Sequence, residues 1–426
     1  MKKLLGLVAF FVAFAVVLPA FAETLTEEEK NMQIAERTQI RILIEDLGNY
    51  RDAQVAAADK LVAKGNSAVP MLIRYLHKAE NENIRANICV VLGRIGAPSA
   101  IESIGAAFAD KSMLVRYKAQ EGLRLLARAN TDAALSDVTN FLREKTKDAN
   151  ENIRSLAVEV LVDLNPSDIW TEIIVLLQDS SAKVRADSAK ALGGISAFAY
   201  DKPEMQATIC NAIIPLCGDS VMEVRRSAAI SLGFYLALST MYQVAVYGAD
   251  EKFSKFDESP NLGLAYKMID SLIAMLGDAD ESVRANAAYS LGKVWVIKAP
   301  MASDKIMDSL IKALDDTSSE VRMYTAMSLG QIGDEKAVGA LIDHLGEKVP
   351  LVLNVMVESL RKRTLKDFGF QPYEILDETP EEPIDTPDKY KAAREALEKK
   401  RQEAIDKWVA WWQENKGTFK VNPMIR

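Results

Sequence analysis

Cysteine and histidine are scarce in this sequence, which limits the chemistry open to it. Only Cys89, Cys210, Cys217, His77 and His344 occur in 426 residues. An exported protein that depends on disulfides carries more cysteine, so we expect three small buried hydrophobic side chains. The histidines form no metal-binding pattern with glutamate, and no HExxH, GxSxG or glycine-rich phosphate loop is present. We therefore expect no catalytic residues, no metal and no cofactor.

A basic excess is also missing. The chain has 52 lysines and arginines against 60 aspartates and glutamates. Binding of nucleic acid needs a basic face that neutralises phosphates. The charge balance therefore argues against a nucleic-acid partner.

Long apolar runs are absent except at the N-terminus. Lys2 and Lys3 precede an apolar run over residues 4–18, and the small-x-small site 20–22 follows. This pattern is typical of a cleavable signal peptide, and the run is short for a membrane span. We therefore predict a signal peptide over residues 1–22, a periplasmic or secreted protein, and no transmembrane segment after cleavage. Removing its two lysines leaves 50 basic and 60 acidic residues, a net charge of −10.

The sequence does contain a repeat, seen in segments such as DSSAKVRADSAKAL and DADESVRANAAYSL. Its seven copies are anchored at Arg85, Arg116, Arg154, Arg185, Arg225, Arg284 and Arg322. A leucine stands seven residues after each arginine, and most copies have a small residue at offset four. These offsets share one helix face. Glycine follows the leucine in five copies (Gly93, Gly193, Gly233, Gly292 and Gly330), where we expect it to end or bend the helix.

Between the anchors lies a second amphipathic segment, such as MIDSLIAML, and no alternating pattern indicates strands. Degenerate copies at Gln54 and Leu353 extend the array. We therefore predict an all-α fold: a solenoid of about nine helix-turn-helix repeats over residues 23–363.

The motif D-x4-[VI]-R-x6-L, kept in register from Ile40 to Arg363, resembles the HEAT-repeat family in its short bacterial form, which is related to phycobilisome-lyase repeats. The resemblance implies helix pairs stacked into a curved, armadillo-like α-solenoid. HEAT-repeat hydroxylases that bind two irons need several His-Glu pairs, which this chain lacks.

The aspartates and arginines of the motif form a ladder of charges. Its members are Asp110, Arg116, Asp148, Arg154, Asp179, Arg185, Asp219, Arg225, Asp278, Arg284, Asp316 and Arg322. We expect each aspartate to satisfy N–H groups at a helix start, and each arginine to bridge to the aspartate of the adjacent repeat. The alternative is a row of ligand-binding charges.

The largest break in the repeat separates Arg225 from Arg284 by 59 residues. Its surplus, about residues 235–261, is rich in aromatics, which supply large contact areas in binding sites. The candidate partner-binding residues are Tyr242, Tyr247, Phe253 and Phe256. Alternatively, residues 235–247 extend the preceding helix, and their aromatics pack on the array.

The C-terminal part differs from the repeats. We predict a proline-rich acidic linker over residues 364–387, a helix over residues 388–415 and a tail over residues 416–426. The DFGF segment, the linker and the Trp408, Trp411 and Trp412 cluster resemble the tail of exported bacterial HEAT-repeat proteins. The tryptophans share one helix face, which either caps the solenoid or docks a partner.

These observations favour a non-catalytic scaffold, outside the cytoplasm, that binds a protein or peptide on the concave face of the solenoid. One alternative is a structural module of the cell envelope. Another is a binder of envelope glycans or polymers that uses the insert aromatics. The identity of the partner and the oligomeric state stay open.

Overall fold

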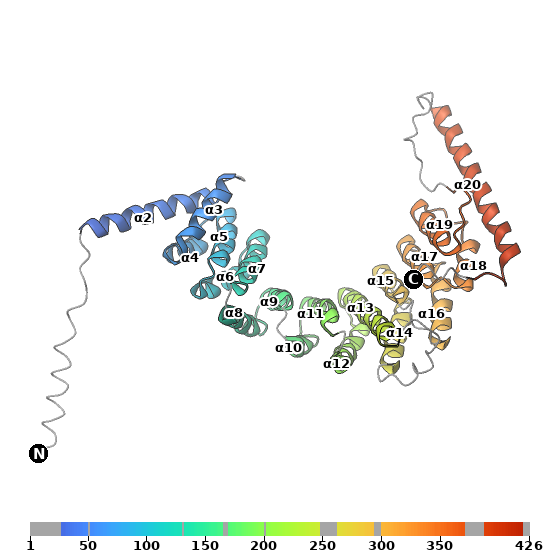
Figure 1. The fold of residues 1–426 in the computed structure, drawn as a ribbon, viewed down its shortest axis with the longest axis horizontal. Coiled ribbons are helices and arrows are strands. Elements are labelled where there is room, and N and C mark those ends of the chain that lie inside the picture. Colours follow the sequence, from blue (N-terminus) through green and yellow to red (C-terminus); the bar gives the residue numbers. More distant parts are fainter. Residues whose placement is uncertain are drawn as a thin grey trace, which may run out of the picture. The chain divides into compact units, whose positions relative to one another are not determined.

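The computed structural model describes residues 27–49, 52–129, 132–164, 169–199, 202–247, 262–293, 300–370 and 387–420. Within these ranges every regular element is a helix (Figure 1). The predicted all-α solenoid is therefore confirmed. Residues 1–26 lie outside the described ranges, as do the greater parts of the predicted linker and tail.

The α-helices from α2 to α19 fall into nine pairs, in which a first helix is followed by a second. The first helices are α2 (Glu27–Asp46), α4 (Val69–Lys78), α6 (Ile101–Ala106), α8 (Asp132–Lys145), α10 (Ile169–Leu176), α12 (Pro203–Ile213), α14 (Leu262–Met275), α16 (Pro300–Ala313) and α18 (Glu335–Asp343). The second helices are α3 (Asp52–Lys64), α5 (Glu82–Ile95), α7 (Met113–Ala127), α9 (Glu151–Leu164), α11 (Ala182–Gly194), α13 (Met222–Tyr247), α15 (Glu281–Gly292), α17 (Ser319–Ile332) and α19 (Pro350–Thr364).

The chain divides into two compact units, residues 1–141 and 142–426. In the first unit, α5 packs against both α3 and α7. In the second unit, α9, α11, α13, α15, α17 and α19 pack one against the next, and α10, α12, α14, α16 and α18 do the same. Each unit is thus a stack of helix pairs in two layers, in which the motif helices form one layer.

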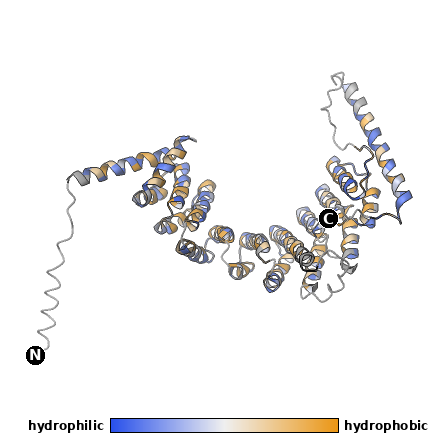
Figure 2. Cartoon of the chain, in the orientation of Figure 1, coloured by the Kyte–Doolittle hydropathy of each residue, from blue (hydrophilic) through white to orange (hydrophobic). Residues whose placement is uncertain are grey.

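The leucine and the small residue of the motif form the core between layers. In the repeat of α11, Leu192 and Ala189 are both fully buried, and the leucines of the other six copies are equally buried. Burying a leucine contributes about 1.5–3 kcal/mol. Figure 2 shows apolar and polar residues together on these helices, as expected for helices with one buried face.

The motif glycines mark close contacts between helices. Two of them stand at helix ends, as expected, since α15 ends at Gly292 and α11 ends one residue after Gly193. For the other three the expectation was wrong. Gly233 and Gly330 lie inside α13 and α17, which continue beyond them. A Cβ on Gly233 would lie 2.6 Å from Cβ of Ser290, on the second helix of the next repeat. Helices α5 and α17 end instead at Gly96 and Gly333, which have positive φ angles of 73° and 64°.

In the second unit, a serine of the next repeat fills the space above each motif glycine. The Ser290 hydroxyl donates a hydrogen bond to the carbonyl of Ala229, over 2.9 Å, and Ser231 and Ser328 donate similar bonds. Because a buried hydroxyl without a partner is costly, these bonds allow a polar residue at the tightest point of the stack.

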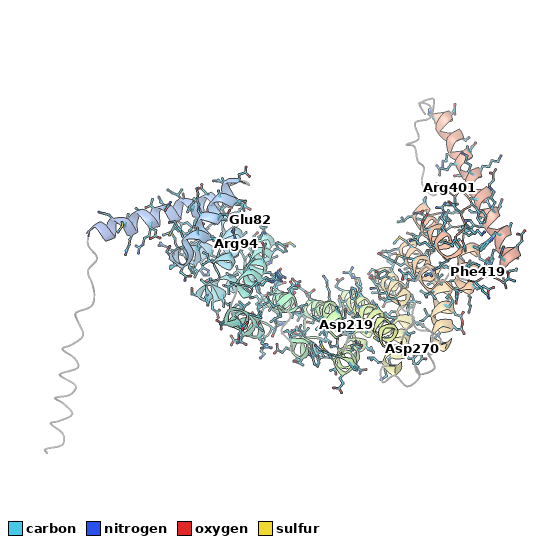
Figure 3. The ribbon with its side chains drawn as sticks, viewed as in Figure 1. Glu82, Arg94, Asp219, Asp270, Arg401 and Phe419 are labelled. Carbon is cyan, nitrogen blue, oxygen red and sulfur yellow. The ribbon has the colours of Figure 1, made fainter. Side chains whose placement is uncertain are left out.

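Helix α20 (Pro387–Asn415) caps the last repeat and contacts α18. Trp408 is fully buried, and its ring lies edge-on to Phe368 with centroids 4.8 Å apart. Trp411 and Trp412 pack against Phe419, which Figure 3 labels beside α20. The tryptophan cluster therefore contacts the chain's own residues, as a capping helix requires.

Candidate functional site

The charged ladder joins successive repeats. Arg185 donates from Nε and Nη2 to the two carboxylate oxygens of Asp219, over 2.8 and 2.9 Å. Its Nη1 donates to the carbonyl oxygen of Asp179, the aspartate of its own repeat, over 2.8 Å. Asp219, labelled in Figure 3, lies in the turn before α13. One guanidinium thus links the start of its own helix to the next repeat with bidentate geometry.

The same pair recurs along the chain. It is present as Arg85–Asp110, Arg154–Asp179, Arg185–Asp219, Arg225–Asp278, Arg284–Asp316 and Arg322–Glu347. Glu347 was not among the expected residues, although it stands six residues before the degenerate anchor Leu353. Arg116 donates to the carbonyls of Asp110 and Lys111, and no ion pair of Arg116 is found among the described residues.

The ladder aspartates lie two residues before the N-cap rather than at it. Asp179 accepts the backbone N–H of Ser181, the N-cap of α11, and Asp148 similarly accepts that of Asn150. The Arg185 hydrogen bonds lower the pKa of Asp219 against the opposing effect of burial. Because these carboxylates are already bonded, the ladder serves the stack and leaves little capacity for a ligand.

The aromatics of the long insertion give no site within the described residues. Helix α13 runs to Tyr247, so residues 235–247 do extend the preceding helix. Tyr235 is fully buried, and its hydroxyl donates to the carbonyl of Leu192 over 2.7 Å. Tyr242 and Tyr247 lie on α13, but their side chains are outside the described ones, and Phe253 and Phe256 lie outside the described residues altogether.

An aromatic cluster does lie on the exposed face of three second helices, α13, α15 and α17. The Lys293 ammonium lies 4.1 Å from the centroid of the Phe234 ring and 4.6 Å from that of Tyr289. Tyr289 in turn meets Tyr324 edge-on, with centroids 5.5 Å apart and planes inclined at 62°. We call these four residues the aromatic–lysine platform. Phe234 is 42% exposed, and the other three are half-buried.

The platform combines apolar area with one positive charge. Burial lowers the pKa of Lys293, since it takes the ammonium out of water. Two aromatic faces partly offset this cost, by about 0.5–1 kcal/mol each at exposed positions. No ion pair of Lys293 is found among the described residues, so a carboxylate from a partner would supply one. Such an arrangement suits contact with a protein surface, where aromatic anchors contribute much of the binding energy.

Sequence reasoning missed the platform because its four residues are spread over three different repeat positions. Tyr289 is five residues after its anchor arginine, whereas Phe234 and Lys293 are nine after theirs. Offset five carries an aromatic in only one of the seven copies, and offset nine does so only at Phe234. A comparison of the exposed offsets across neighbouring repeats would have revealed two aromatics side by side.

The described residues provide little for chemistry. Among them, no group of three or more histidines, cysteines or acids is placed to hold a metal ion. The thiols of Cys89, Cys210 and Cys217 are free. Burial raises the pKa of Cys89 and of Cys217 to about 12, which keeps both protonated and unreactive. Across the described ranges, no helix has the length and apolar character needed to cross a membrane.

Comparison with known proteins identifies the fold. A sequence model of HEAT repeats matches residues 41–124 and 269–361, the second of which contains α15 and α17. No curated protein sequence matches the chain. Among solved structures, a triple mutant of Kap121p is 14% identical, with a TM-score of 0.53, over 79% of this chain and 38% of its own length.

Two further structures are similar. Kap95p, solved with RanGDP, is 13% identical over 81% of this chain and 46% of its own length, with a TM-score of 0.50. The Escherichia coli protein YibA is 17% identical over 74% of this chain and 98% of its own length, with a TM-score of 0.43. The chain thus covers less than half of either Kap protein, and the likeness to the two is one of fold.

Proposed function

We propose that this chain, a HEAT-repeat protein, is a non-catalytic scaffold that acts in the periplasm or outside the cell and binds a protein or peptide partner at the aromatic–lysine platform. Solenoids of this kind commonly mediate protein interactions. The observation that carries the proposal is the exposed cluster of Phe234, Tyr289, Lys293 and Tyr324 across three repeats. The signal-like residues 1–22 support the location.

Several features favour a partner protein over a small molecule. The platform is an open surface on adjacent helices, where a partner can contact several repeats at once. An aromatic anchor of this kind typically contributes 2 kcal/mol or more to a protein interface, which is about 30-fold in affinity. The ladder carboxylates are occupied by arginine, and the described cysteines are protonated, so neither set competes as a reactive centre.

The test is affinity capture from native envelope extract with residues 23–426 as bait, followed by titration of the captured protein. The platform variant carries Phe234→Ser and Tyr289→Ser. The matched control carries Val175→Ser on α10, where the replaced side chain is 69% exposed. We expect one dominant protein that binds the control normally and the platform variant about 30-fold more weakly.

Other outcomes assign the function differently. Binding that survives the platform variant but is lost with Phe253→Ser and Phe256→Ser moves the site to the insertion. Co-fractionation with insoluble envelope material without any captured protein favours a structural envelope module. Retention on purified cell-wall polymer that needs the insert aromatics favours a polymer binder. In each of these cases the platform proposal fails.

A further inference from the structure

A basic groove lies in the first unit, between α2 and α4. Its volume is about 550 Å³, and it is lined by Ile34, Arg37, Thr38, Arg41, Met71, Arg74, Tyr75, Lys78 and Ala79. The four cations come in two pairs, each spaced by four residues on one helix, so each pair occupies one helix face. The lining contains no acidic residue.

These cations have no structural role visible in the described residues. None of the four forms an ion pair there, whereas six of the seven ladder arginines do. On α11, by contrast, Lys183 meets an acid four residues on, Asp187, over 2.8 Å. Two like charges four residues apart instead destabilise a helix by about 0.2–0.5 kcal/mol. An unbalanced arrangement on both walls of one groove is what a site for an anionic ligand requires.

The groove is not purely polar. Ile34 is 61% exposed, and Met71 and Tyr75 are half-buried on the opposite helix. Apolar and aromatic side chains between the cations add contact area that an inorganic anion or phosphate cannot use. A peptide uses both, because its acidic side chains meet the cations while its other side chains cover the apolar surface.

The spacing of the cations matches an extended chain. Residues four apart on a helix are separated by about 6 Å along its axis. Alternate residues of an extended peptide are separated by about 6.6 Å and point the same way. A strand with acids at every second position would therefore meet Arg37 and Arg41, or Arg74 and Lys78, in register.

The charge of the whole chain selects against long polyanions. The protein has a net charge of −8, so a nucleic acid that extends beyond the groove meets repulsion from the rest of the surface. A short acidic segment meets mainly the groove itself.

We propose that the groove between α2 and α4 is a second interaction site, which binds an extended acidic peptide segment of a partner protein.

Fluorescence anisotropy tests the proposal on residues 23–426. The probe is a labelled decapeptide of alternating glutamate and valine, and its control has glutamine in place of glutamate. The groove variant carries Arg41→Gln and Arg74→Gln. The matched variant carries Lys60→Gln and Arg128→Gln, two exposed cations of the same unit that lie outside the groove. Both variants change the net charge equally.

We expect the acidic decapeptide to bind, its glutamine control not to bind, and the groove variant to bind about tenfold more weakly. The matched variant should change affinity by less than about twofold, because it alters only the general field. Circular dichroism melts confirm that both variants are folded. The platform variant should bind the decapeptide normally, which separates this proposal from the previous one.

Three results overturn it. The first is no binding of the acidic decapeptide at 0.15 M salt. The second is an equal loss in the groove and matched variants, since that shows a nonspecific charge effect. The third is groove-dependent binding of phosphatidylglycerol vesicles or of single-stranded DNA without binding of the decapeptide, which assigns the groove to a membrane or to nucleic acid.

Discussion

Two sets of arginines in this chain have opposite surroundings. Six of the seven ladder arginines are mostly buried and hold both oxygens of a carboxylate from the next repeat, as Arg185 holds Asp219. Arg37, Arg41 and Arg74 line a groove, are exposed, and have no carboxylate partner among the described residues. The ladder recurs with the repeat, whereas the groove arginines stand outside the repeated motif.

The difference shows how a repeat array separates stability from recognition. A residue that recurs in register meets the same neighbour in each successive repeat, so its contacts hold the stack. A charge or aromatic that departs from the repeat need not meet such a neighbour, and where it is exposed it is available to a ligand. The platform of Phe234, Tyr289, Lys293 and Tyr324 follows the second rule, since its residues are peculiar to adjacent repeats.

The largest expected effect comes from breaking a ladder pair. In Arg85→Ala, Asp110 is left buried without its partner, because the side chains are only 7% and 14% exposed in the pair. Loss of one partner from a buried pair costs about 3–5 kcal/mol. The measurement is urea unfolding followed by circular dichroism.

Arg94→Ala is the matched control on the same helix. Arg94 also pairs with an aspartate of another helix, Asp59, but the two side chains are 39% and 58% exposed. An exposed pair contributes about 0–1 kcal/mol. Equal losses in the two variants would contradict the distinction between buried ladder and exposed pairs.

Most of the fold follows from the sequence because each repeat presents the same pattern again. Leucine and a small residue at fixed offsets predict the buried face of a helix, and Leu192 and Ala189 occupy that face. The glycines show where this reasoning stops. Gly233 leaves room for Ser290 of the next repeat. Its role therefore depends on a contact between repeats, which a pattern within one repeat does not contain.

The candidate site was less predictable for a related reason. Aromatics concentrated in an insertion are easy to see in a sequence, whereas Tyr289 and Phe234 are 55 residues apart and meet only through Lys293. Likewise, Arg37 and Arg74 belong to different helices, and only their packing makes one groove. Pairing of surface residues from neighbouring repeats requires the stacking geometry, which offsets along one chain segment do not provide.

The second-largest expected effect comes from Gly93→Ala, which tests the close approach of α5 and α7. A Cβ on Gly93 would lie 2.7 Å from Cα of Gly122, so the two backbones have to separate in Gly93→Ala. Overpacking of this kind costs about 1–3 kcal/mol. The matched control is Gly194→Ala at the end of α11, where a Cβ meets no atom within 4 Å.

In the control, alanine reduces the freedom of the unfolded chain without a clash, so we expect a gain of about 0.4–1 kcal/mol. Urea unfolding measures both variants. A neutral Gly93→Ala would show that the helices tolerate separation and that the glycine is not required for the stack.

The smallest effect is the pH dependence of a single ladder pair, because it reports only the part of the interaction that protonation removes. The hydrogen bonds of Arg185 hold the pKa of Asp219 below its ordinary value in the folded chain. The stabilisation is therefore complete above the unfolded value, about 3.9, and is lost as the pH falls through the lower folded value. In Arg185→Ala these hydrogen bonds are absent, so Asp219 contributes less of this dependence, which the backbone N–H of Val221 and the charge of Arg225 still support. The difference in Tm between the natural chain and Arg185→Ala should accordingly be largest near pH 7 and shrink below about pH 4.

Thermal melts from pH 7 to pH 3 measure this difference in Tm, with Arg94→Ala as the exposed-pair control. A difference that stays constant over this range would mean that Arg185 stabilises the stack through its bond to the Asp179 carbonyl rather than through Asp219.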